Sequence, residues 1–162
     1  MTSSPLVVVE RQALDTIRSV AAASGFRHEV GGVLLGSYRG PHIHVVNVTQ
    51  PQERDRSSFN RFWRRPDGHQ TMAEAAWLGS GRTVTYVGEW HTHPEPVPRP
   101  SWIDRMEWSR KLAEQHRDLV FLIQGQLDVY LEYSPMYGGK RALVRAEDGA
   151  DAVLYRPRPN PW

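Results

Sequence analysis

The segment Gly88-Glu-Trp-His-Thr-His-Pro-Glu-Pro-Val-Pro-Arg-Pro-Ser-Trp-Ile-Asp104 connects a predicted strand to a predicted helix. Residues 83–90, which lead into it, are rich in β-branched and aromatic side chains and therefore predict a strand. His91 and His93 stand two positions apart at the end of this strand. Because alternate side chains of a strand face the same side, both imidazoles are expected on one surface.

The second half of the segment predicts a loop followed by the start of a helix. Prolines at 94, 96, 98 and 100 cannot continue a sheet ladder. Ser101-Trp-Ile-Asp104 has the pattern of a helix N-cap with an acidic residue in the first turn, which directs Asp104 back toward the strand end. Two imidazoles and one carboxylate suit zinc and leave a fourth tetrahedral position for water. The alternative for Ser101 and Asp104 is a helix capping box with no metal nearby.

A candidate general base lies upstream, in Glu29-Val-Gly-Gly-Val-Leu-Leu-Gly36 at the entry to an apolar run. The glycine pair at 31 and 32 weakens a strand interior, so it indicates a bulge or the close approach of another backbone. Such an approach fits a position where Glu29 leans into a site.

These pieces together form one longer pattern. Glu-x-Gly-Gly-x-Leu-x-Gly from residue 29, then His-Thr-His, seven residues, Ser, two residues and Asp, resembles the JAMM motif of the MPN metalloproteases. The run from Tyr86 to Glu95, with Pro100-Ser101 and Trp108, is similar to short bacterial JAMM proteins of mobile elements and anti-phage operons. These include the deconjugating peptidase of cyclic-oligonucleotide-based anti-phage signalling (CBASS) systems. The resemblance spans roughly residues 5 to 146.

The resemblance implies a fold and a role for each motif residue. The fold is α/β, a single MPN domain over residues 1–162 with a mixed β-sheet flanked by helices and a proline-rich C-terminal tail from about residue 156. His91, His93 and Asp104 would hold Zn²⁺ as the cofactor. Glu29 would take a proton from the attacking water, and Ser101 would donate a hydrogen bond to the oxyanion.

The resemblance also implies a substrate, an amide or isopeptide bond after the C-terminal glycine of a ubiquitin-like protein. The expected setting is bacterial anti-phage defence, with activating-enzyme-like, conjugating-enzyme-like and nucleotidyltransferase operon partners. Trp90, Glu95 and Trp102 flank the motif and are candidates to line a channel for the substrate tail, although core packing explains the two tryptophans equally well. Two alternatives stay open: a peptidase that processes a sulfur-carrier protein, and a non-catalytic MPN scaffold.

Composition excludes several other functions. A chain of 162 residues with 40% hydrophobic content suits one domain with one core. It contains no cysteine, which excludes disulfides, thiolate nucleophiles, cysteine-ligated zinc and a deaminase-like Pro-Cys-x-x-Cys site. A net charge of +2 does not favour nucleic acid as a partner. No apolar run is long enough to span a membrane and Met1-Thr-Ser-Ser4 does not start a signal peptide, so we expect a cytoplasmic protein.

Two further features of the sequence are candidate sites. Arginines and aromatic residues alternate through residues 54–65, which predicts a solvated loop or, alternatively, a substrate-facing or RNA-binding insertion. His42 and His44 repeat the His-x-His spacing, but no Ser-x-x-Asp follows, so we expect two exposed strand side chains. The remaining histidines, His28, His69 and His116, are expected at the surface or at caps.

The rest of the chain alternates predicted strands and helices. Strands are predicted at residues 6–9, 30–38, 42–49, 118–124, 127–133 and 141–145. Helices are predicted at residues 10–24, 67–78 and 101–116, the last with Trp102, Met106 and Ala113 in one stripe.

Overall fold

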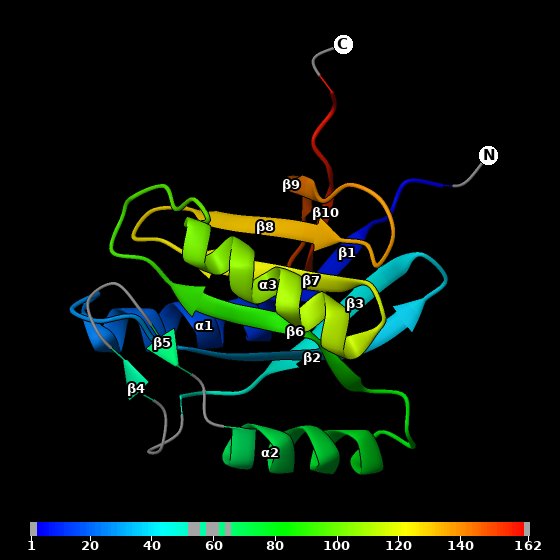
Figure 1. Cartoon of the computed structure of the whole chain (residues 1–162), viewed down its shortest axis with the longest axis horizontal. Helices are drawn as coiled ribbons and strands as arrows, with labels where there is room; N and C mark the ends of the chain where they lie inside the picture. The colour runs from blue at the N-terminus through cyan, green and yellow to red at the C-terminus, as the bar shows by residue number, and fades with distance from the viewer. Residues whose placement is uncertain (1–2, 52–55, 58–61, 64–65, 161–162) are drawn as a thin grey trace.

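The strands of this protein form a barrel that closes on itself (Figure 1). The structure, a computed structural model, describes residues 3–51, 56–57, 62–63 and 66–160. Around the barrel the strand order is β1-β10-β9-β8-β7-β6-β2-β3. The bounds are β1 Val7–Glu10, β2 Gly31–Arg39, β3 His42–Val48, β6 Thr85–Thr92, β7 Leu119–Gln124, β8 Val129–Ser134, β9 Arg141–Asp148 and β10 Ala152–Pro157. The pairs β1/β3 and β6/β7 are parallel and the others antiparallel, so the sheet is mixed, as predicted.

The expectation of a mixed sheet flanked by helices is therefore only partly correct, because the eight strands of this sheet close into a barrel. Closure depends on β10, a strand that the sequence analysis missed. β10 pairs with β9 on one side and with β1 on the other, and β1 pairs with β3. The predicted strand at 141–145 also extends further, to Asp148. β10 ends at Pro157, so the tail predicted from about residue 156 begins inside this strand.

Helix α1, Arg11–Ser24, packs into the main core of the barrel. Its buried face consists of Ala13, Leu14, Ile17 and Ala21, which matches the predicted helical spacing. The helix ends at Gly25, whose left-handed φ of 62° allows its N–H to bond the carbonyl oxygen of Ala22. Both the helix and its glycine terminator are confirmed.

Helix α3, Trp102–Gln115, packs on the opposite face of β7. Val120 and Leu122 of β7 face the main core, whereas Phe121 and its alternate neighbours face α3. Trp108 of α3 stacks on Phe121 with ring centroids 4.6 Å apart. The β7 strand is thus buried on both sides and holds α3 in a fixed position beside the end of β6.

The residues predicted to form one stripe of α3 do not pack against the sheet. Trp102 is 73% exposed and Met106 is 46% exposed. Trp108 and Leu112 contact the second core cluster instead. The apolar spacing gave the helix correctly, but the periodicity of a short amphipathic segment did not decide which stripe faces inward.

A buried carboxylate on β8 further holds the start of α3. Glu132 is 1% exposed and forms an ion pair with Arg105, which follows Asp104 on the first turn of α3. The hydroxyls of Tyr130 and Ser134 donate to the same carboxylate at 2.7 and 2.8 Å. Because each oxygen of this buried group has partners, the network fixes the helix without leaving an unsatisfied charge.

The glycine pair of β2 allows a close backbone approach, as predicted. A Cβ at Gly31 would lie 2.3 Å from the carbonyl oxygen of Trp90, and one at Gly32 would lie 2.2 Å from that of Thr49. β2 pairs with β6 so that Gly31 is opposite His91. The absence of side chains at these two positions brings Glu29, which precedes them, next to the histidine strand.

Segment 50–68 is described only in part. Two short strands, β4 Arg56–Ser57 and β5 Phe62–Trp63, pair with each other. The predictions for the other arginines and aromatic residues of 54–65 lie outside the described residues or concern side chains that the structure does not describe. Helix α2, Pro66–Gly79, confirms the helix predicted at 67–78. Within the described part of the chain, no helix combines the length and apolarity needed to cross a membrane.

Four histidines outside the His91/His93 pair have structural roles. His42 and His44 are half-buried rather than exposed: Nδ1 of His42 accepts the Leu6 N–H at 3.0 Å, and His44 contacts Glu10 at 2.9 Å. The surface prediction for His69 is wrong, since this residue is 1% exposed and its Nδ1 lies 2.6 Å from the hydroxyl of Thr49. His116 caps α3 in a left-handed conformation, which confirms the cap prediction.

Candidate metal centre

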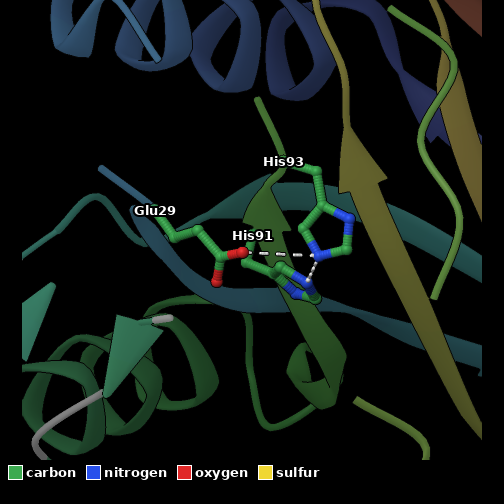
Figure 2. Close-up of side chains that lie close together, drawn as sticks. All are labelled: Glu29, His91 and His93. Atoms are coloured by element: carbon green, nitrogen blue, oxygen red, sulfur yellow. Dashed lines mark hydrogen bonds and ion pairs between the residues drawn. The ribbon is translucent and has the colours of Figure 1, made fainter. Parts of the chain in front are cut away.

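The two imidazoles of the His-x-His pair converge at the end of β6 (Figure 2). His91 lies within β6 and His93 immediately follows it, so both side chains leave the same face of the strand. Their Nε2 atoms are 3.1 Å apart, and the ring centroids are separated by 4.8 Å. The two ring nitrogens are therefore close enough to bind the same metal ion.

Asp104 approaches both imidazoles from the first turn of α3. Its Oδ1 lies 3.2 Å from Nε2 of His91, and its Oδ2 lies 3.2 Å from Nε2 of His93. The backbone N–H of Ser101 donates to Oδ2 at 2.7 Å, and the hydroxyl of Ser101 accepts from the N–H of Asp104 at 3.1 Å. The helix capping box is therefore present, but it does not exclude a metal: the capping residue Asp104 also faces the histidines.

Glu29, which precedes β2, lies close to the same two imidazoles. Figure 2 shows its carboxylate directed at His93, with Oε1 3.6 Å from Nε2. The side chain is buried, at 6% exposure. Ligand atoms of Glu29, His91 and His93 all lie within 4.8 Å of one another. Asp104 lies close to both imidazoles and Glu29 close to one, which favours Asp104 over Glu29 as a metal ligand.

The electrostatics of the centre follow from burial and close opposite charges. Burial raises the pKa of Glu29, although His91 and His93 act in the opposite direction. The pKa of Asp104 is well below its usual range: burial alone would raise it, but the hydrogen bonds with both histidines outweigh burial. Burial would lower the pKa of His93, yet hydrogen bonding to Asp104 and nearby carboxylates raises it. The centre thus carries carboxylate charge suited to a divalent cation.

The residue between the two histidines connects Glu29 to the histidine strand. Thr92 is 1% exposed, and its hydroxyl accepts the N–H of Val30 at 3.1 Å. Its own N–H donates to the carbonyl oxygen of Val30 at 2.9 Å. This double link fixes the backbone next to Glu29.

Replacing Thr92 with Val is expected to lower the free energy of unfolding by about 1–3 kcal/mol, because the buried N–H of Val30 loses its acceptor while the side-chain volume is nearly unchanged. Urea denaturation of the metal-free protein measures the loss. Thr92→Ser keeps the hydroxyl and serves as the matched control. Equal midpoints for Thr92→Val and the wild type would show that this hydrogen bond contributes nothing.

Of the three residues expected to line a substrate channel, Trp102 is the most exposed, at 73%. Trp90 is 1% exposed and its Nε1–H donates to the carbonyl oxygen of Thr49 at 3.0 Å, so core packing is its role. Glu95 contacts a predicted ligand instead: its Oε1 lies 2.9 Å from Nδ1 of His93. The sequence signal for this contact is an acidic residue two positions after a histidine.

The donor set fits a divalent metal ion. The two Nε2 atoms are 3.1 Å apart and each lies 3.2 Å from one oxygen of Asp104 in a partly buried position, and Glu29 completes the cluster. Neutral imidazoles with one carboxylate favour zinc among the common ions, whereas an all-oxygen set would favour magnesium or calcium.

The sequence of this chain matches one family model and several known proteins. The family model of prokaryotic homologues of the JAB domain matches residues 10–137. A Pseudomonas aeruginosa protein named CD-NTase/cGAS isopeptidase is 38% identical over 135 residues, covering 82% of this chain and 85% of that protein. The Vibrio cholerae protein of the same name is 35% identical over 129 residues, covering 80% and 82%.

Two further similarities are more distant, one in sequence and one in fold. A probable metalloprotease of Sinorhizobium fredii, y4qB, is 34% identical over 84 residues and covers 48% of each chain. The solution structure of protein DSY2949 from Desulfitobacterium hafniense superposes with a TM-score of 0.60 at 19% identity, covering 84% of this chain and 88% of that one. At this identity the similarity concerns the fold alone.

Proposed function

Since the chain belongs to the family of prokaryotic JAB-domain homologues, we propose that it is a zinc-dependent isopeptidase of bacterial anti-phage defence. The observation that carries the proposal is the convergence of two imidazoles, the Asp104 carboxylate and the buried Glu29 on one point. His91, His93 and Asp104 hold the ion, and the chain forms one catalytic domain with its proline-rich tail at the C-terminus.

Zinc bound at this position supplies Lewis acidity and makes hydrolytic water available at neutral pH. The remaining work falls to side chains of this protein. Glu29 takes a proton from the water through its carboxylate and passes it to the leaving amine. Glu29 is buried and the Thr92–Val30 hydrogen bonds fix the backbone next to it, which reduces the reorganisation needed for proton transfer.

Ser101 is proposed to donate a hydrogen bond to the oxyanion of the tetrahedral intermediate. In the structure its hydroxyl oxygen accepts the Asp104 N–H, and a hydroxyl can accept and donate at once. Its own hydrogen is therefore compatible with donation toward the substrate. The capping contact fixes the side chain in one rotamer, as oxyanion stabilisation requires.

The proposed substrate is the isopeptide bond that links a protein's C-terminal tail to a lysine of its target. The names of the relatives point to conjugates of a CD-NTase, and the motif resemblance points to a ubiquitin-like protein. In either substrate the bond to be cleaved follows a flexible tail whose last carbonyl group is joined to a lysine amine, and such a tail can bind in extended form.

The test is intact-mass analysis of such a conjugate after incubation with the purified chain. Tail conjugates of a CD-NTase and of a ubiquitin-like protein from the neighbouring genes are compared, with zinc-loaded and chelator-treated protein. Hydrolysis at the tail by the zinc-loaded protein alone is expected. Zinc binding without hydrolysis of either conjugate would contradict the proposed substrates, and the absence of zinc binding would contradict the proposed enzyme.

Replacing Trp102 with Ala is expected to raise KM about 10-fold with little change in kcat, since a tryptophan 73% exposed directly after Ser101 is a typical anchor for a bound chain. Steady-state kinetics on the cleaved conjugate measure both constants. Tyr137→Ala removes an aromatic side chain that is 82% exposed on the β8–β9 connection, and this control should leave KM unchanged. A wild-type KM in Trp102→Ala would exclude the side chain from substrate binding.

A further inference from the structure

The second ring nitrogen of His93 has its own acidic partner. Nε2 of His93 faces His91, Glu29 and Asp104, whereas Nδ1 lies 2.9 Å from Oε1 of Glu95. We propose that Glu95 is a positioning residue of the metal centre, which orients His93 and fixes its tautomer, rather than part of a substrate channel. The inference rests on the metal site of the proposed function.

The chemistry of the contact has one favourable assignment. A carboxylate accepts hydrogen bonds and cannot donate them when ionised, so Nδ1 of His93 must carry the hydrogen. The lone pair is then on Nε2, the atom that converges with the other ligands. Histidines that bind metals commonly donate their other N–H to a carboxylate in this way, which sets the ring orientation and raises the basicity of the ligand.

The loop that carries Glu95 is held rigidly although its side chain is 47% exposed. The carbonyl oxygen of Glu95 accepts the N–H of Gln126 at 2.8 Å, and that of Pro96 accepts the N–H groups of Leu127 and Asp128, both at 3.0 Å. These bonds connect the loop to the turn between β7 and β8. An exposed carboxylate on a mobile loop would be a weak partner, whereas here the backbone has already been ordered by the fold.

A glycine makes this connection possible. A Cβ at Gly125 would lie 2.6 Å from Cδ of Pro98 and 2.7 Å from the carbonyl oxygen of Glu95. The proline-rich loop is thus packed directly on the β7–β8 turn. This loop, residues 94–100, therefore acts as a brace: its packing on the β7–β8 turn holds Glu95 next to His93. The same loop connects β6 to α3.

The test measures zinc affinity, not hydrolysis, by competition with a chromophoric chelator at fixed pH. Glu95→Ala is expected to weaken zinc binding about 10–100-fold, in line with the loss of a carboxylate behind a histidine ligand. Glu95→Gln keeps an oxygen acceptor and should recover part of the affinity. Glu114→Ala, which removes an exposed carboxylate of α3, is the matched control and should bind zinc like the wild type.

A spectroscopic signature separates positioning from general stability. The Nδ1–H proton of His93 should give a protected NMR signal in the wild type and in Glu95→Gln, and this signal should be lost in Glu95→Ala. Gly125→Ala, which displaces the brace without changing Glu95, should weaken zinc binding in the same direction.

Three results would overturn the inference. Equal zinc affinity of Glu95→Ala and the wild type would show that His93 needs no partner. If Glu114→Ala weakens zinc binding as much as Glu95→Ala does, the loss of affinity comes from the change in net charge. A wild-type protein that binds no zinc would reject the metal site itself, and with it both this inference and the proposed function.

Discussion

Replacing Glu29 with Gln is expected to lower kcat by about 10²–10⁴-fold while zinc stays bound, because the substitution removes a proton acceptor and keeps the size of the side chain. The structure favours this separation. His91 and His93 contact Asp104 at 3.2 Å each, whereas Glu29 lies 3.6 Å from His93. Retention of the metal and loss of proton transfer are therefore separable in this one variant.

The measurement pairs single-turnover hydrolysis of the conjugate with the zinc content of the same sample. Glu74→Gln, an exposed carboxylate on α2, is the matched control and should turn over like the wild type. Wild-type kcat in Glu29→Gln would exclude the residue as the base. Loss of zinc together with activity would instead make Glu29 a ligand, the assignment that its position in the cluster also allows on distance alone.

The proximity of the candidate site residues could be predicted because their sequence signals are local. Two histidines at strand spacing and a Ser-x-x-Asp helix start each fix a side-chain direction without knowledge of the rest of the fold. The structure brings all five predicted residues together, although their catalytic roles stay predictions. The approach of Glu29 to the histidine strand depends on a long-range contact, and Gly31 and Gly32 indicated it, since a glycine pair in a strand suggests that another backbone lies close.

What the sequence did not predict depends on long-range pairing. β10 closes the barrel by pairing with β1, at the other end of the chain, and no local pattern identifies such a partner. The buried Glu132 looks like a surface residue of an alternating strand, yet Arg105 from α3 compensates its charge. His69 looked like a surface residue for the same reason, because its partner Thr49 lies on a different element.

Ser101 is proposed to cap helix α3 and to donate a hydrogen bond to the oxyanion, and the geometry of the capping box shows how to separate these two roles. Its hydroxyl accepts the N–H of Asp104, a contact whose removal costs about 0.5–2 kcal/mol in typical helices. Removal of an oxyanion donor typically costs about 10²–10³-fold in kcat. Ser101→Ala should therefore lose both stability and activity, and this result alone would not distinguish an oxyanion donor from a displaced Asp104.

Ser101→Asp distinguishes them, because aspartate caps a helix as well as serine does but its carboxylate cannot donate a hydrogen bond. We expect Ser101→Asp to unfold at a urea midpoint near that of the wild type while kcat falls about 10²–10³-fold. Ser101→Thr keeps both a cap and a hydroxyl and should retain most of the activity. If Ser101→Asp turns over like the wild type, the hydroxyl serves the helix alone. If Ser101→Ala loses activity that Ser101→Asp regains, the role of this residue is to hold Asp104 against the two histidines.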